Sequence, residues 1–127
     1  MDTTERVRFA HSDLTKEIIA AFYAVHSHFR HGFPEAAYQR SMPIALAKRG
    51  LRCEREVPYD LFYEGVNVGQ YIADLVVEGR VLVELKSVEK LSTAHISQTV
   101  NYLKVSGIPL GLLLNFGPSA QIRRLIL

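Results

Sequence analysis

The apolar residues of this chain change their spacing along the sequence, and this change constrains the fold more than any other feature. In the first part they recur every three or four positions, as on one face of a helix: Leu14, Ile18, Phe22, Val25 and Phe29. From Leu51 apolar and polar residues alternate, which predicts strands that continue through Lys86. A helical pattern returns after Ser92. The chain is therefore predicted to be of the α/β class.

The boundaries of the first two helices follow from capping residues. The first helix is expected to begin near Ser12 or Asp13. Pro34 suits the first turn of a second helix, and Gly50 suits the position just after its end. Pro43 lies inside this second helix and removes a backbone hydrogen bond, so we expect a kink or a break at residues 39–42.

Turn residues divide the strand region into three or four strands. Breaks are predicted at three places: Pro58, Glu64-Gly65 and Glu78-Gly79. A third helix is expected from Ser92 as its N-cap to Gly107 as its end, with one apolar face formed by Ile96, Val100 and Leu103. Two further strands are predicted at residues 110–116 and 122–127. Arg123-Arg124 marks the second of these as an edge strand.

The order of these elements limits the topology. A strand that is joined through a helix to another strand usually returns parallel to it, so the sheet should be mixed and flanked by helices. The chain has 127 residues, of which 48% are hydrophobic and 22% charged, which fits one domain. We expect a single domain over residues 1–127, with residues 1–10 as a short polar lead.

Composition excludes several classes of protein. The longest apolar stretch, residues 110–114, is much shorter than the roughly 20 residues of a membrane span. The N-terminal residues form no signal peptide, and a lone Cys53 can form neither an internal disulfide nor a cysteine-based zinc site, so we expect a cytoplasmic protein. The net charge of +2 permits contact with a polyanion without requiring it.

The segment from Tyr71 to Lys86 carries charges where the surrounding residues are apolar. Glu84 and Lys86 are two residues apart in one strand, so their side chains point to the same side. Asp74 joins them only if the hairpin has an even register sum, which a three-residue loop or a bulge at Gly79 would supply. In that register the two carboxylates lie opposite or diagonal to each other.

Two adjacent carboxylates repel each other unless a positive charge lies between them. Hard oxygen ligands of this kind suit Mg²⁺ or Mn²⁺. The alternative is a solvated hairpin in which Lys86 merely neutralises its acidic neighbours. By spacing alone the two interpretations are about equally supported.

These residues resemble the D-(D/E)xK signature of PD-(D/E)xK nucleases, with nine residues between Asp74 and Glu84-Leu85-Lys86. The resemblance extends to the GxxExxY proteins, whose motif is present as Gly32-Phe33-Pro34-Glu35-Ala36-Ala37-Tyr38. Further matching pieces are spread over most of the chain: Ile18-Ile19, Val25-His26, Gly69 to Asp74, Gln98, Asn101-Tyr102-Leu103 and Gly111 to Gly117. Gln39-Arg40 depart from the pattern, since acidic residues are common there.

The resemblance implies a restriction-endonuclease-like αβββαβ core with an extra N-terminal helix. It implies metal binding by Asp74 and Glu84, a position for Lys86 beside the scissile phosphate, and the Leu85 carbonyl as a further ligand. It also suggests Glu35 as a third acidic ligand, direct or through water. The alternative role for Glu35 is a partner for the dipole at the start of its helix.

Gln98 and Tyr102 lie four residues apart and resemble the QxxxY element of RecB-like nucleases. That resemblance implies contact with substrate phosphate or with Lys86, whereas the alternative is a helix surface with Tyr102 packed on the sheet. His26, His28 and His31 do not share one helical face, so a zinc site is disfavoured and His26 is expected to pack on the core. The basic pairs Lys48-Arg49 and Arg123-Arg124 could guide nucleic acid, although such pairs are more often simply solvated.

The leading hypothesis is a metal-dependent nuclease that uses Mg²⁺ or Mn²⁺ and acts on nucleic acid, most readily DNA. We expect no association with a membrane, and a homodimer is an option. Two rivals stay open. One is a non-catalytic module that binds nucleic acid or docks a partner on the same fold. The other is a structural dimerisation domain. Intact Asp74, Glu84 and Lys86 favour the enzyme.

Overall fold

The computed structural model describes residues 12–127, so the expected polar lead at residues 1–10 lies outside the described residues. Three helices are present: α2 (Ser12–Phe29), α3 (Glu35–Lys48) and α4 (Thr93–Ser106). Five strands accompany them: β1 (Cys53–Tyr63), β2 (Val66–Val77), β3 (Val81–Lys86), β4 (Leu110–Phe116) and β5 (Ala120–Ile126). No helix among residues 12–127 is long and apolar enough to cross a membrane.

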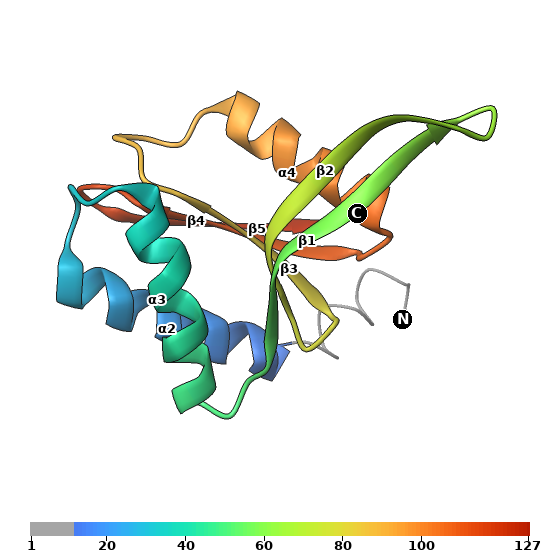
Figure 1. Cartoon of the computed structure of the whole chain (residues 1–127). Coiled ribbons are helices and arrows are strands. Elements are labelled where there is room, and N and C mark those ends of the chain that lie inside the picture. Colours follow the sequence, from blue (N-terminus) through green and yellow to red (C-terminus); the bar gives the residue numbers. More distant parts are fainter. Residues whose placement is uncertain (1–11) are drawn as a thin grey trace.

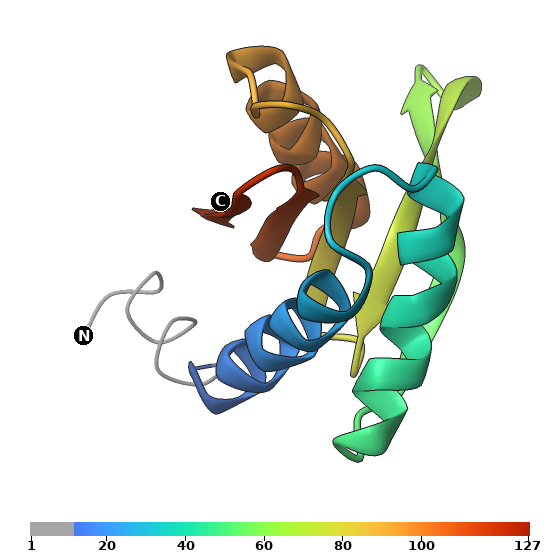
Figure 2. The same cartoon turned by 90° about the vertical axis from the view of Figure 1, so that its left-hand side faces the viewer.

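The five strands form one mixed sheet in the order β1-β2-β3-β4-β5. Only β3 and β4 run parallel, because α4 connects them, and the other neighbours are antiparallel. Helices α2 and α3 lie on one side of the sheet and α4 on the other (Figures 1 and 2). The predicted mixed sheet and the restriction-endonuclease-like α/β fold are confirmed.

Two apolar clusters hold these layers together. The larger joins α2 and α3 to one face of the central strands, with Phe22, Tyr38 and Phe116 among its fully buried rings. The smaller joins α4 to the opposite face through Leu103. A Cβ atom built on Gly111 would lie 2.9 Å from the Leu103 side chain, so glycine permits the close approach of α4 to β4.

Two predicted breaks at proline are absent. Helix α3 continues through Pro43, so of the expected kink or break the break is wrong. Strand β1 likewise continues through Pro58, which pairs with Ile72. Proline is tolerated there because β1 is an edge strand, and no further strand lies on its outer side to accept a hydrogen bond from an N–H. The breaks at Glu64-Gly65 and Glu78-Gly79 are confirmed as turns, which gives three strands in this region.

The third helix has the predicted ends but a different buried face. Ser92 is its N-cap and Gly107, with φ of 76°, ends it. The prediction that Ile96, Val100 and Leu103 form the buried face is wrong in part, because Thr99 and Leu103 are fully buried whereas Ile96 and Val100 are half-buried. The hydroxyl of Thr99 donates to the carbonyl of His95 at 3.0 Å, so a polar residue can occupy the core position.

Strand β2 leaves the central sheet at Asp74. Only its last residues, Leu75 to Val77, pair with β3. Ala73 and Leu75 are two residues apart, yet they pack in opposite core clusters, so β2 changes the face that it presents at Asp74. The remainder of the β1–β2 hairpin, residues 57–73, projects from the sheet and is called the arm below (Figure 1). Asp74 therefore lies where the arm begins.

Candidate active site

The turn between β2 and β3 sets Asp74 opposite Glu84. Leu75 pairs with Val83 and Val77 pairs with Val81, which leaves residues 78–80 as a three-residue turn. This is the even register that Asp74 needs in order to join Glu84 and Lys86, and the three-residue turn supplies it. Strand pairing ends just before Asp74, so its side chain occupies the place where β2 separates from β3.

Each carboxylate accepts a hydrogen bond from a backbone amide of the other strand. The Leu85 amide donates to Asp74 Oδ2 at 2.8 Å, and the Asp74 amide donates to Glu84 Oε1 at 3.2 Å. These bonds replace the ladder that would otherwise continue between the strands. The backbone thus fixes both side chains in one place with little freedom.

Burial of these acids makes their charge costly. Glu84 is only 6% exposed, and its burial together with the adjacent Asp74 carboxylate raises its pKa from 4.5 to about 9. The pKa of Asp74 is also raised, mainly by burial, although the Leu85 amide and Lys86 oppose the rise. The pair therefore retains a proton at neutral pH unless another positive charge approaches it.

Lys86 supplies a positive charge beside both acids. It is half-buried at the end of β3, two residues after Glu84. Its ammonium group lowers the pKa of Asp74, Glu84 and Glu35, so all three carboxylates lie within its field. One cation among three acids leaves the cluster with excess negative charge when the acids ionise.

Glu35 points toward this cluster from the first turn of α3. Burial raises its pKa, and the charge of Asp74 adds to the rise. The amide nitrogen of Gln39 bridges the two acids, because it donates to Glu35 Oε1 at 3.3 Å and to Asp74 Oδ1 at 3.2 Å. Glu35 is thus connected to Asp74 through one amide group.

Gln39 is the site residue that sequence reasoning missed. It was noted only as a departure from the family pattern. The signal that could have found it is its position one turn after Glu35 on the same face of α3. A polar cavity of about 630 Å³ lies beside it, between α3 and the base of the arm. Its lining residues are Gln39, Arg55, Glu56, Pro58, Gln70, Ile72 and Asp74.

The two predicted residues of α4 differ in their position. Tyr102 is half-buried and its ring meets that of Tyr71 edge to face, with centroids 5.2 Å apart. Burial raises the pKa of its hydroxyl, and the charges of Glu84 and Asp74 raise it further, so Tyr102 borders the acidic cluster. Gln98 is exposed on the surface of α4.

Other candidate residues have structural contacts. Tyr38 is fully buried and its ring stacks on Phe116, with centroids 4.3 Å apart. Its hydroxyl donates to the Arg30 carbonyl and accepts from the Phe33 amide, so it braces the loop before α3. His26 packs on the core as expected, and its Nε2 donates to the Gly117 carbonyl at 2.9 Å.

The donor set suits a hard divalent cation rather than zinc. Among residues 12–127 no three His, Cys, Asp or Glu side chains converge as a complete metal site. The carboxylates of buried Glu84 and half-buried Asp74 nevertheless lie together with raised pKa values, and their oxygens are the ligands that Mg²⁺ and Mn²⁺ prefer. The residues therefore fit such a cation, with water filling the rest of its coordination.

Comparisons with known proteins show the fold and the superfamily of this chain. The chain resembles the crystal structure of SSO0001, with a TM-score of 0.61 and 16% identity over 97% of this chain, which supports the fold. It spans only 62% of that chain. No curated protein sequence matches the chain. The family model of the PD-(D/E)XK nuclease superfamily matches residues 12–125, and the chain therefore belongs to that superfamily.

Proposed function

We propose that this chain is a metal-dependent nuclease that hydrolyses phosphodiester bonds of nucleic acid at Asp74, Glu84 and Lys86. The observation that carries the proposal is the pair of buried carboxylates, fixed by each other's strands, with a lysine beside them. Carboxylates whose pKa values are raised by burial are typical of a functional site, and their burial is costly where they have only a structural role. Membership of the superfamily supports the same chemistry.

Asp74, Glu84 and the Leu85 carbonyl would hold Mg²⁺ or Mn²⁺, and Glu35 would join them directly or through water. Such a cation supplies charge for the phosphate and an acidified water when it is bound. The negative charge of the Asp74 and Glu84 carboxylates repels other anions, and their oxygens orient the water. Gln39 keeps Glu35 aimed at Asp74 through its two hydrogen bonds.

Lys86 and Tyr102 act on the substrate in this proposal. The Lys86 ammonium lies within the field of the three acids, where it can orient the attacking oxygen and stabilise charge that develops on the phosphate. The Tyr102 hydroxyl, at the border of the cluster, contacts a substrate phosphate. Gln98 lies one turn earlier and extends that contact along the exposed side of α4.

The motif at residues 32–38 places the chain, in this proposal, among the GxxExxY proteins of the superfamily. Tyr38 supports that assignment, because it braces the segment that delivers Glu35. We propose DNA as the substrate and the cytoplasm as the location, which is consistent with a single half-buried cysteine that stays reduced.

Cleavage of defined substrates tests the proposal. The purified chain is incubated with single- and double-stranded DNA and RNA, with Mg²⁺, Mn²⁺ or a chelator. Metal-dependent cleavage that is lost in Asp74→Asn and kept in the neighbouring surface variant Asp60→Asn is expected. Retention of nucleic acid without cleavage under every condition would instead support the non-catalytic binding module. Equal cleavage by the Asp74→Asn variant would overturn the assigned site.

A further inference from the structure

The tip of the arm exposes large apolar side chains. Phe62 is 61% exposed, Tyr63 69%, Val66 63% and Val68 58%. They lie on both sides of the turn at Glu64-Gly65, beyond the last contacts of the hairpin with α4. Large apolar side chains clustered at the end of a projecting hairpin are typical of an interaction site. Aromatic side chains are enriched among residues that dominate binding energy.

The charge of the arm indicates which kind of partner it fits. No lysine, arginine or histidine occurs between Arg55 and Arg80, whereas Asp60 and Glu64 lie at or near the tip. A polyanion such as nucleic acid would be repelled by these carboxylates. Two arms packed against each other would bring like charges together. The arm therefore fits an apolar surface with a basic border.

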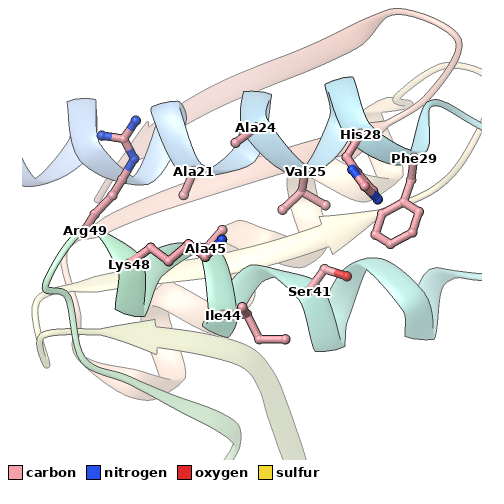
Figure 3. A pocket seen from close by; sticks show the side chains of 10 residues that line it. All are labelled: Ala21, Ala24, Val25, His28, Phe29, Ser41, Ile44, Ala45, Lys48 and Arg49. Atoms are coloured by element: carbon pink, nitrogen blue, oxygen red, sulfur yellow. The ribbon is translucent and has the colours of Figure 1, made fainter.

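This chain carries a surface of that kind between α2 and α3. A cavity of about 600 Å³ opens there (Figure 3), and neither Asp74 nor Glu84 lines it. Small residues, Ala21, Ala24 and Ala45, leave the room, and Phe29 and Ile44 form apolar walls. Ile44 is 63% exposed. We call this cavity the α2–α3 groove.

Basic side chains border one end of the α2–α3 groove. Lys48 forms no ion pair within residues 12–127, and it points along the groove in Figure 3. Arg49 is held beside it by Glu17 at 2.8 Å. His28 lines the other end. The groove thus combines apolar walls with positive charge, which complements the apolar and acidic arm.

We propose that the arm of one copy docks in the α2–α3 groove of a second copy. The arm extends away from α2 and α3 in Figure 1, so it does not reach the groove of its own chain. Phe62 and Tyr63 enter between the helices, and Glu64 meets Lys48. Each copy has one arm and one groove, so two copies that exchange arms about a twofold axis form a closed dimer.

Sedimentation velocity of the full chain tests this docking. The wild type is expected to self-associate at about 100 μM, and Phe62→Ser is expected to weaken association at least about tenfold. Leu127→Ser is the matched control, because Leu127 is 55% exposed at the end of the chain, outside both surfaces. A monomeric wild type at this concentration, or association that Phe62→Ser leaves unchanged, would overturn the proposal.

Charge-reversal variants distinguish specific docking from nonspecific association. Glu64→Lys alone and Lys48→Glu alone should each weaken association, because each places like charges at the contact. The double variant with both changes should restore association to near the wild-type level, since the pair is re-formed with reversed signs. A double variant as weak as the single variants would contradict docking of the arm in the groove. Neither residue belongs to the acidic cluster, so the outcome is independent of nuclease activity.

Discussion

At the scale of single residues, the acidic cluster is defined by Asp74 and Glu84, which lie opposite each other on β2 and β3. Each carboxylate accepts a hydrogen bond from a backbone amide that ordinary strand pairing would have used. Burial raises the pKa of both. The fold therefore brings together two carboxylates that disfavour each other's ionisation in the absence of a cation. This cost is measurable in the isolated protein.

Metal-free protein should lose stability as pH rises between about 4.5 and 9. The folded state keeps a proton on Glu84 up to about pH 9, whereas the unfolded state releases it near its ordinary value of 4.5. Folding stability from this group is complete below that ordinary value and is lost as pH rises through the folded pKa. The slope is at most about 1.4 kcal/mol per pH unit.

Thermal unfolding in a chelator across this pH range provides the measurement. The Glu84→Gln variant is the matched control, because an amide keeps the shape and cannot titrate. Its melting temperature should depend less on pH than that of the wild type and should exceed it at the alkaline end. Parallel curves for the two proteins would contradict the raised pKa of Glu84.

Gln39→Glu should make the metal-free protein less stable and its affinity for Mn²⁺ higher. The change replaces a donor to Glu35 and Asp74 with a fourth carboxylate beside the cluster, so repulsion rises and cation binding relieves more of it. We expect a loss of about 1–3 kcal/mol without metal. Calorimetry with Mn²⁺ measures the affinity. Arg40→Gln, which changes net charge equally at an exposed neighbour, should alter neither quantity by as much.

At the scale of elements, α3 is placed by Tyr38 rather than by strong amphipathic character. Its buried residues are few, Tyr38, Met42 and Leu46, and the Tyr38 ring stacks on Phe116 of β4. The same residue ties down the loop that leads into Glu35. The site therefore depends on a core residue that faces away from it.

Tyr38→Phe should lower stability by about 1 kcal/mol, because the ring stacking persists while the Arg30 carbonyl and the Phe33 amide lose their partner. For a domain of this size the melting temperature should fall by roughly 3–6 °C. Tyr23→Phe is the control, since the Tyr23 ring is 47% exposed on α2. Equal effects of the two changes would show that the Tyr38 hydroxyl does not brace the loop.

The errors in the predicted elements have local physical causes. Pro58 does not break its strand, because proline interrupts a strand only where its missing N–H is needed, and β1 has no neighbour on its outer side. Pro43 removes one backbone hydrogen bond of α3, and the helix continues on the others. The buried face of α4 shifted to Thr99 because its hydroxyl bonds within the helix. In contrast, Ser92 and Gly107 were predicted correctly, since capping depends on neighbouring residues alone.

At the scale of the whole molecule, sequence order determined the sheet. A helix between β3 and β4 requires a parallel pair, and the tight turns require antiparallel pairs, so the mixed topology could be predicted. The departure of β2 from β3 at Asp74 could not, because alternation of side chains does not report where two strands separate. Gln39 was missed for a related reason, since its role depends on how closely α3 approaches that point.

The Lys86→Ala variant tests the central claim most directly, when Mn²⁺ binding and cleavage are measured on the same preparation. In the proposed function, Lys86 would act on charge that develops in the reaction, whereas Asp74 and Glu84 would hold the cation, so the two measurements should separate. We predict that affinity for Mn²⁺ stays within about threefold of the wild type while cleavage falls by about 100-fold or more. Cleavage at the wild-type rate, or loss of Mn²⁺ binding as complete as in Asp74→Asn, would contradict the account.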